Sequence, residues 1–177
     1  MQSPVGPIFG FNLGSPILAT ITNNNITNCV AENITHLPGG TGTANLPYAA
    51  GIGVAGKDQV LLGCVANNIT STDAAVGEAY GIRLSTNTDS AIIANNRVIK
   101  CTSPNLAANT SGGIFDASVL QNSTYENNYA EFNGRLGNVN FIPATLTPGT
   151  PIQDWIVPGF PAAQVAGKLD NINRRNP

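Results

Sequence analysis

The chain has 177 residues, of which 10% are charged, and its net charge is −2 at neutral pH. Soluble domains usually carry about 25% charged residues, so we expect a surface that is polar but largely uncharged. Only eight residues are lysine or arginine, which argues against a nucleic-acid partner, because phosphate binding needs clustered positive charge. No apolar run is long enough for membrane insertion, and no signal peptide is visible.

The first segment, 1–14, combines apolar residues with prolines, and we predict that it caps the end of a repetitive domain spanning 15–142. The repeat is visible in two stretches, CVAENITHL at 29–37 and CVANNITST at 64–72. Further asparagine pairs follow at 95–96 and 127–128. The second asparagines return at intervals of 35, 28 and 32 residues, and periods of this size indicate a stacked repeat architecture.

The repeat predicts columns of equivalent side chains. We expect Asn33, Asn68, Asn96 and Asn128 to form one ladder at a tight bend. Asparagine tolerates the left-handed backbone that such a bend requires. We also expect Cys29 to lie directly above Cys64, with Ile92 and Thr124 continuing that column, as a thiol ladder and not a disulfide.

A second landmark is a Gly-Ile pair near the start of each unit, at 51–52, 81–82 and 113–114, with 16–19 in the equivalent place of the first unit. Each unit therefore predicts three short strands separated by bends. The connections of variable length are rich in Gly, Pro, Ser and Asn, which is typical of loops. They span 36–50, 72–80 and 102–112.

These features predict an all-β chain that forms a right-handed, single-stranded parallel β-helix of about four to five coils. The repeat, with asparagine at the bend, resembles the pectate-lyase-like β-helix family over roughly residues 15–142. A β-sandwich is the alternative, but it predicts turn signals without long-range alignment of identical residues.

The resemblance raises the possibility of an enzyme that cleaves acidic polysaccharides, but the residues do not support one. Such sites need carboxylates stacked on neighbouring coils, and the acids here share no column. Asn87-Thr88-Asp89 matches one fragment of the polygalacturonase signature without the rest of it. Asp73 and Glu78 lie in one loop, where solvation explains them. His36 is the only histidine, and no zinc-type spacing includes the three cysteines. We therefore predict no catalytic, cofactor or metal site.

The last segment, 143–177, has a different composition, with many prolines and the only tryptophan. Proline prevents both helix interior and central strand, so we predict an extended tail anchored through Trp155, Ile156, Val157 and Phe160. These side chains suit packing on the same chain or on a neighbouring subunit. At the level of fold alone, short β-helices with such tails resemble the trimeric spike proteins of phages and other viruses.

Two functions follow from these observations. The favoured hypothesis is a non-enzymatic structural protein, a homo-oligomer with a trimer preferred, on a virion or extracellular surface with other surface proteins as partners. The alternative is a carbohydrate-active enzyme or glycan-binding module. In that case the loops 36–50, 72–80 and 102–112 would form one groove, with Tyr48 and Tyr80 stacking on sugar rings.

Overall fold

The computed structural model describes residues 2–3, 8–14, 21–38, 48–105, 111–118, 123–131, 133, 141–143 and 155–156. All regular elements in these residues are β-strands, which confirms the all-β prediction, and every strand pairing among them is parallel. The described residues contain no helix that could cross a membrane.

The strands form three sheets, and within each sheet neighbouring strands come from successive repeats. The six-stranded sheet contains β1 (Gln2–Ser3), β4 (Val30–His36), β7 (Val65–Ser71), β10 (Arg97–Ile99), β13 (Asn128–Glu131) and β15 (Trp155–Ile156). The five-stranded sheet contains β14 (Phe141–Pro143), β11 (Ser111–Asp116), β8 (Glu78–Leu84), β5 (Tyr48–Val54) and β2 (Ile8–Leu13). The four-stranded sheet contains β12 (Thr124–Glu126), β9 (Ile92–Ala94), β6 (Val60–Leu62) and β3 (Asn25–Thr27).

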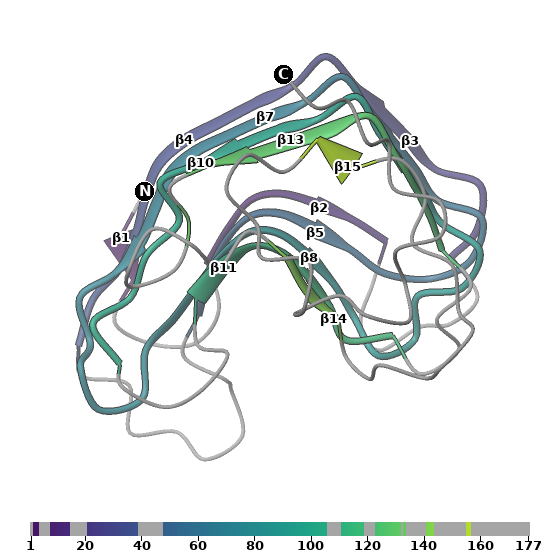
Figure 1. Cartoon of the computed structure of the whole chain (residues 1–177). Coiled ribbons are helices and arrows are strands. Elements are labelled where there is room, and N and C mark those ends of the chain that lie inside the picture. The colour runs from purple at the N-terminus through teal and green to yellow at the C-terminus, as the bar shows by residue number, and fades with distance from the viewer. Residues whose placement is uncertain are drawn as a thin grey trace.

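From β2 to β14 the chain visits the sheets in a fixed order: five-stranded, four-stranded, six-stranded, and then five-stranded again. Figure 1 shows the six-stranded sheet as an outer arch above the five-stranded sheet, with strands of successive repeats stacked one behind another. Each sheet is therefore built from one strand per repeat. The strands are short because a bend follows every few residues.

The register gives the repeat length directly. The hydrogen bonds between equivalent corner residues link positions 35 apart at Cys29 and Cys64, and 32 apart at Cys64 and Asn96. The predicted alignment of Asn68 with Asn96, which is a shorter interval, is wrong. The residue equivalent to Asn68 is Lys100, because Asn67 pairs with Ile99 and Thr70 with Thr102.

The main core lies between the five- and six-stranded sheets, and inward columns such as Ile52–Ile82–Ile114 fill it. A glycine column allows the close approach of the two sheets. A Cβ on Gly81 would lie 1.9 Å from Val98 Cγ1, and one on Gly51 would lie 2.8 Å from Ala66 Cβ. The Gly-Ile landmark of the sequence thus marks a place where the two sheets pack too closely for a larger residue.

The first unit does not begin as the sequence predicted. The pairing of Phe11 with Ile52 places Gly10 and Phe11 of β2 at the Gly-Ile position, and the predicted equivalent, 16–19, lies outside the described residues. β2 is thus a regular strand inside the segment predicted as a cap. The boundaries 1–14, 15–142 and 143–177 stay predictions.

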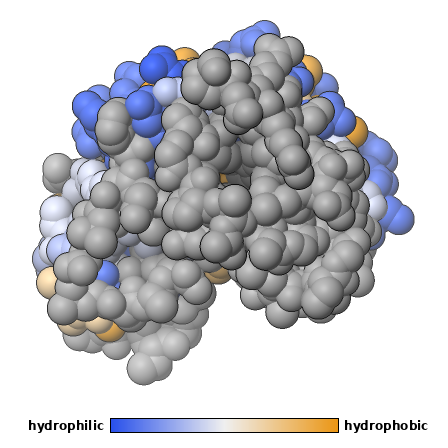
Figure 2. Space-filling model, in the orientation of Figure 1, coloured by the Kyte–Doolittle hydropathy of each residue, from blue (hydrophilic) through white to orange (hydrophobic). Residues whose placement is uncertain are grey.

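The surface of the described part is mostly polar. Figure 2 shows hydrophilic residues over the outer arch, with a few isolated hydrophobic spots. The exposed apolar side chains include Val30 and Ile92, which are 55% and 43% exposed. Lys57 and Asp89 form an ion pair at 3.9 Å.

Candidate functional site

Three columns of left-handed residues form the bends of the repeat. All nine non-glycine residues with positive φ among the described residues belong to them. The first column contains Asn23, Asp58 and Ser90; the second contains Asn28, Gly63, Asn95 and Asn127; the third contains Asn33, Asn68 and Lys100. Asparagine dominates because its short polar side chain tolerates this backbone better than most residues do.

The predicted asparagine ladder divides between two places. Asn33 and Asn68 lie in the third bend column, where the Asn68 amide donates to Asn33 Oδ1 at 2.7 Å on the exposed side. Asn96 and Asn128 lie at the corner after the second bend column, and Asn96 Nδ2 donates to Asn128 Oδ1 at 3.0 Å in the interior. The single ladder of four residues is therefore wrong.

The corner column is Cys29–Cys64–Asn96–Asn128, since Val65 pairs with Val30 and with Arg97. The stacking of Cys29 on Cys64 agrees with the prediction, and the described cysteines are free thiols. The predicted continuation through Ile92 and Thr124 is wrong, because Ile92 pairs with Thr124 on one side and with Val60 on the other in the four-stranded sheet.

The buried asparagines at this corner satisfy backbone groups. Asn96 Oδ1 accepts from Cys64 N at 2.8 Å, and Asn96 Nδ2 also donates to Leu61 O at 3.1 Å. Asn128 Nδ2 donates to Ile93 O at 2.7 Å. Both side chains are almost fully buried. Each side-chain amide thus supplies hydrogen bonds to backbone groups that would otherwise be buried without a partner at the bend.

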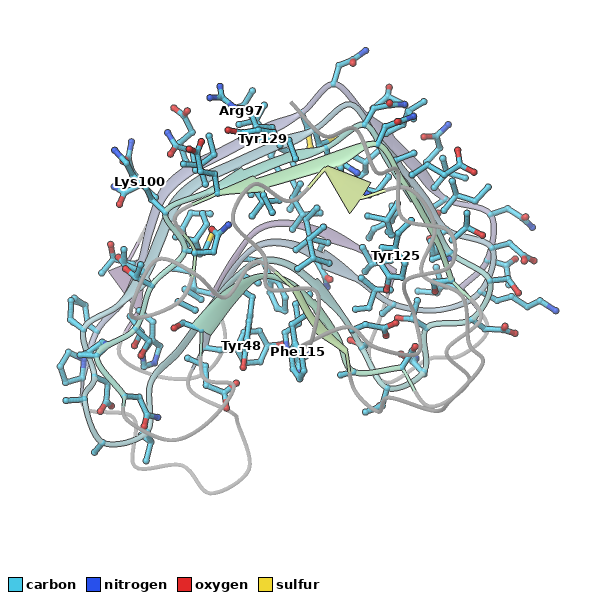
Figure 3. The ribbon with its side chains drawn as sticks, in the orientation of Figure 1. Tyr48, Arg97, Lys100, Phe115, Tyr125 and Tyr129 are labelled. Atoms are coloured by element: carbon cyan, nitrogen blue, oxygen red, sulfur yellow. The ribbon has the colours of Figure 1, made fainter. Side chains whose placement is uncertain are left out.

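Tyr48 and Tyr80 lie in an aromatic cluster on the outer side of the five-stranded sheet, and they are only 6% and 1% exposed. Figure 3 shows Tyr48 and Phe115 below the five-stranded sheet, on the side away from the main core. The guanidinium of Arg83 lies 4.4 Å from the ring centre of Tyr48 and 5.5 Å from that of Phe115. Phe115 stacks on Tyr80 with ring centres 4.7 Å apart, so the protein itself covers both tyrosines, and neither is available for stacking on a sugar ring as the sequence suggested.

Asp73 and Glu78 have specific partners, so solvation does not explain them. Asp73 Oδ1 accepts from the amides of Ala75 and Val76 and so holds the turn in place. Glu78 accepts from Tyr80 OH at 3.1 Å, and its pKa is raised because burial disfavours its charged form.

His36 is fully buried, with Nδ1 3.2 Å from Ser71 Oγ. Burial lowers the pKa of its imidazole, and the charge of Asp73 opposes this effect. His36 and Ser71 are in contact, but both are buried, and this pair is no surface site. Within the described residues no group of three or more His, Cys, Asp or Glu side chains could hold a metal ion.

A carboxylate also lies inside the last repeat. Asp116 occupies the core-facing column of Val54 and Leu84, and it accepts hydrogen bonds from Ser118 and from Tyr125 OH at 2.7 Å. Burial, with Asp116 nearby, raises the pKa of Tyr125 well above its usual value. No sequence pattern predicts this network, because its partners come together only when the repeat is in register.

The outer face of the six-stranded sheet carries a shallow cavity of about 350 Å³. Its polar lining comes from Glu32, Asn67, Arg97, Lys100 and Glu131, and its apolar lining comes from Val65 and Ile99. Figure 3 shows Arg97, Lys100 and Tyr129 on the outer side of the arch. Sequence reasoning missed this site because it depends on which strands of different repeats are neighbours.

Of the predicted tail residues, Trp155 and Ile156 form β15, which pairs with β13. Val157 and Phe160 lie outside the described residues. Comparisons of the chain with protein-family models, with curated proteins and with solved structures give no significant match.

Proposed function

We propose that the chain is a right-handed, single-stranded parallel β-helix of about four to five coils. The fixed order in which the chain visits the three sheets supports this path, as do the parallel, in-register pairings. A right-handed path is the general preference for connections between parallel strands. The pectate-lyase-like family remains the resemblance on which this proposal draws.

On this fold we propose a non-enzymatic structural function, as a homo-oligomeric component, with a trimer preferred, of a virion or an extracellular surface. The observation that carries the proposal is the repetitive stacking itself, which produces a rigid column whose outer side has few charges. Such a column leaves edge strands at its ends, among them β3 and β12 of the four-stranded sheet in the described part. Edge strands of this kind need a cap or a partner.

The test compares the full chain with a variant that lacks residues 143–177, using light scattering coupled to size-exclusion chromatography. We expect an oligomer for the full chain and a smaller species for the truncated chain, because the tail carries the apolar side chains proposed to pack on a neighbouring subunit. Circular dichroism of the truncated chain must retain the β-sheet signal. A full chain that is monomeric at all concentrations would contradict the assembly.

A glycan-binding module is the second candidate, and the described ends of its predicted loops support it. The connections after β4, β7 and β10 all lead from the six-stranded to the five-stranded sheet. Ser103 Oγ donates to Gly77 O at 2.8 Å, which joins two of them. Binding of the full chain to a panel of immobilised neutral and acidic polysaccharides tests this candidate, and binding that persists in Asp73→Asn would exclude a role for that carboxylate.

A further inference from the structure

Lys100 occupies an unusual backbone position. It has φ of 57° in the third bend column, where the two preceding repeats have Asn33 and Asn68. A left-handed conformation costs an L-residue without a short polar side chain roughly 1–2 kcal/mol. The two asparagines show the residue type that suits this bend. Lysine at the same place destabilises the backbone and adds a positive charge. Strain of this kind is a recognised indicator of a functional position.

The charge of Lys100 is placed beside that of Arg97. Both line the cavity on the outer face of the six-stranded sheet, and both are exposed. Among the described residues, neither has a carboxylate oxygen within the 4.0 Å of an ion pair. The Arg97 guanidinium lies 5.8 Å from the ring centre of Tyr129, which orients it over that ring without neutralising it.

The carboxylates of the cavity have other partners. Glu32 Oε1 accepts from Asn67 Nδ2 at 3.3 Å, and Glu131 Oε2 accepts from Tyr129 OH. These bonds come from neutral donors, so each carboxylate keeps its charge and has unused acceptor positions. The cavity therefore combines two cations that have no ion-pair partner among the described residues with two carboxylates that can accept further hydrogen bonds.

We propose that this cavity binds the phosphate or sulfate group of a small hydroxylated ligand, with Arg97 and Lys100 contacting the anion and with Glu32 and Glu131 accepting from the ligand's hydroxyl groups. An arginine fork matches two oxygens of one group, and a lysine ammonium takes a further oxygen. A tetrahedral anion offers the additional oxygen, whereas a planar carboxylate has only two. The site goes beyond the proposed structural function and does not depend on the oligomeric state.

The experiment is isothermal titration calorimetry of the full chain at low ionic strength. The probes are glycerol 1-phosphate, inorganic phosphate, inorganic sulfate, sodium acetate and glycerol. We expect glycerol 1-phosphate to bind with a Kd on the order of 1 mM, inorganic phosphate and sulfate more weakly, and acetate and glycerol not measurably. Added salt should weaken the binding, because exposed charges are screened.

Lys100→Asn is the decisive variant, since it removes the charge and restores the residue of the other two repeats. We expect roughly tenfold weaker binding of glycerol 1-phosphate, together with a Tm that rises by about 1–3 °C as the strain is relieved. Arg97→Gln should also weaken binding. Lys57→Gln is the matched control, because it makes the same change in net charge outside the six-stranded sheet and should leave binding unchanged.

Several outcomes would overturn the proposal. Absence of heat with both phosphate probes would remove the site, and equal weakening by Lys57→Gln and Lys100→Asn would reduce it to general charge attraction. Binding of acetate as tight as that of phosphate would contradict the tetrahedral anion. Inorganic phosphate that binds as tightly as glycerol 1-phosphate would show that the ion alone is recognised and would contradict the roles of Glu32 and Glu131. A Tm lowered by Lys100→Asn would contradict the strain argument.

Discussion

Asparagines in this chain have two different functions, which are clearest when Asn96 is compared with Asn68. Asn96 follows the left-handed Asn95, and its side chain points inward to bond the backbone of the neighbouring repeats. Asn68 is itself the left-handed residue, and its side chain is exposed. Both are the second member of an Asn-Asn pair in the sequence. The second asparagine of the pair thus adopts the left-handed backbone at one bend and supplies hydrogen bonds to buried backbone groups at the other.

The difference follows from the position of each pair relative to its bend. In Asn95–Asn96 and Asn127–Asn128 the first residue takes positive φ, and the second begins the inward column. In Asn67–Asn68 the first residue points outward and only the second takes positive φ. Glycine can occupy a left-handed position without strain. A buried asparagine both donates to and accepts from backbone groups, and a side chain of the same shape without an amide cannot make both kinds of hydrogen bond.

The strongest way to break this comparison is Asn96→Ala. The change leaves Cys64 N without its acceptor and Leu61 O without its side-chain donor in the interior, and it removes a partner of Asn128. We expect the free energy of unfolding to fall by about 2–4 kcal/mol, as measured by urea titration followed by circular dichroism. Asn96→Gly should be at least as destabilising, because backbone freedom does not restore the hydrogen bonds. A loss below about 0.5 kcal/mol would contradict the interior role.

A second test uses the buried side of the third bend. Cys101 directly follows Lys100 and is fully buried, and burial raises the pKa of its thiol. The unfolded chain releases this proton near the ordinary value, while the folded chain retains it. Stability is therefore fully present below the unfolded pKa and falls as the pH rises above it. Between about pH 8.5 and pH 9.5 we expect Cys101 to account for a loss of about 1 kcal/mol.

The measurement is urea unfolding at both pH values for the wild type, Cys101→Ala and Val98→Ala. Cys101→Ala should lose less stability between the two pH values than the wild type does. Val98→Ala also truncates a buried side chain but removes no titrating group, so its pH dependence should match that of the wild type. The thiol of Cys29, whose pKa burial raises to about 12, contributes to the slope of all three proteins. Identical slopes in the wild type and Cys101→Ala would contradict the argument.

Much of this architecture could be predicted from the sequence. Cys29 and Cys64 stack because the interval between the two matching stretches has no insertion, so each residue pairs with its copy. The Gly-Ile pairs at 51 and 81 can also be recognised in the sequence. They recur because the close packing of the two sheets tolerates only glycine at their first position. The predicted alignment is wrong at Asn96, because it matches the Asn-Asn pair at 95–96 with the pair at 67–68, although the two pairs lie at different bends. Matching Thr70 with Thr102 would have given the register that the structure shows.

The sites could be predicted far less well. The sequence suggests Tyr48 and Tyr80 as glycan contacts, but aromatic side chains of neighbouring repeats pack against them. The cavity at Arg97 and Lys100 combines residues of four strands, β4, β7, β10 and β13, and the bend that contains Lys100. Its composition depends on a register that differs from the predicted alignment by four residues, the interval between Asn96 and Lys100. Contacts between repeats are sensitive to such a shift, whereas the strand content of each repeat is not.

The smallest expected effect concerns the exposed bend. Asn68→Ala forces a Cβ-bearing residue without a polar side chain into φ of 56° and removes the exposed bond to Asn33. We expect a loss of about 0.5–1 kcal/mol in urea titration. Asn68→Gly should recover most of that loss, because glycine adopts this backbone freely. Glycine rescues position 68 and not position 96 only if the backbone governs one column and the side chain governs the other. Equal losses for Asn68→Ala and Asn68→Gly would instead assign the stability of the exposed bend to the amide ladder.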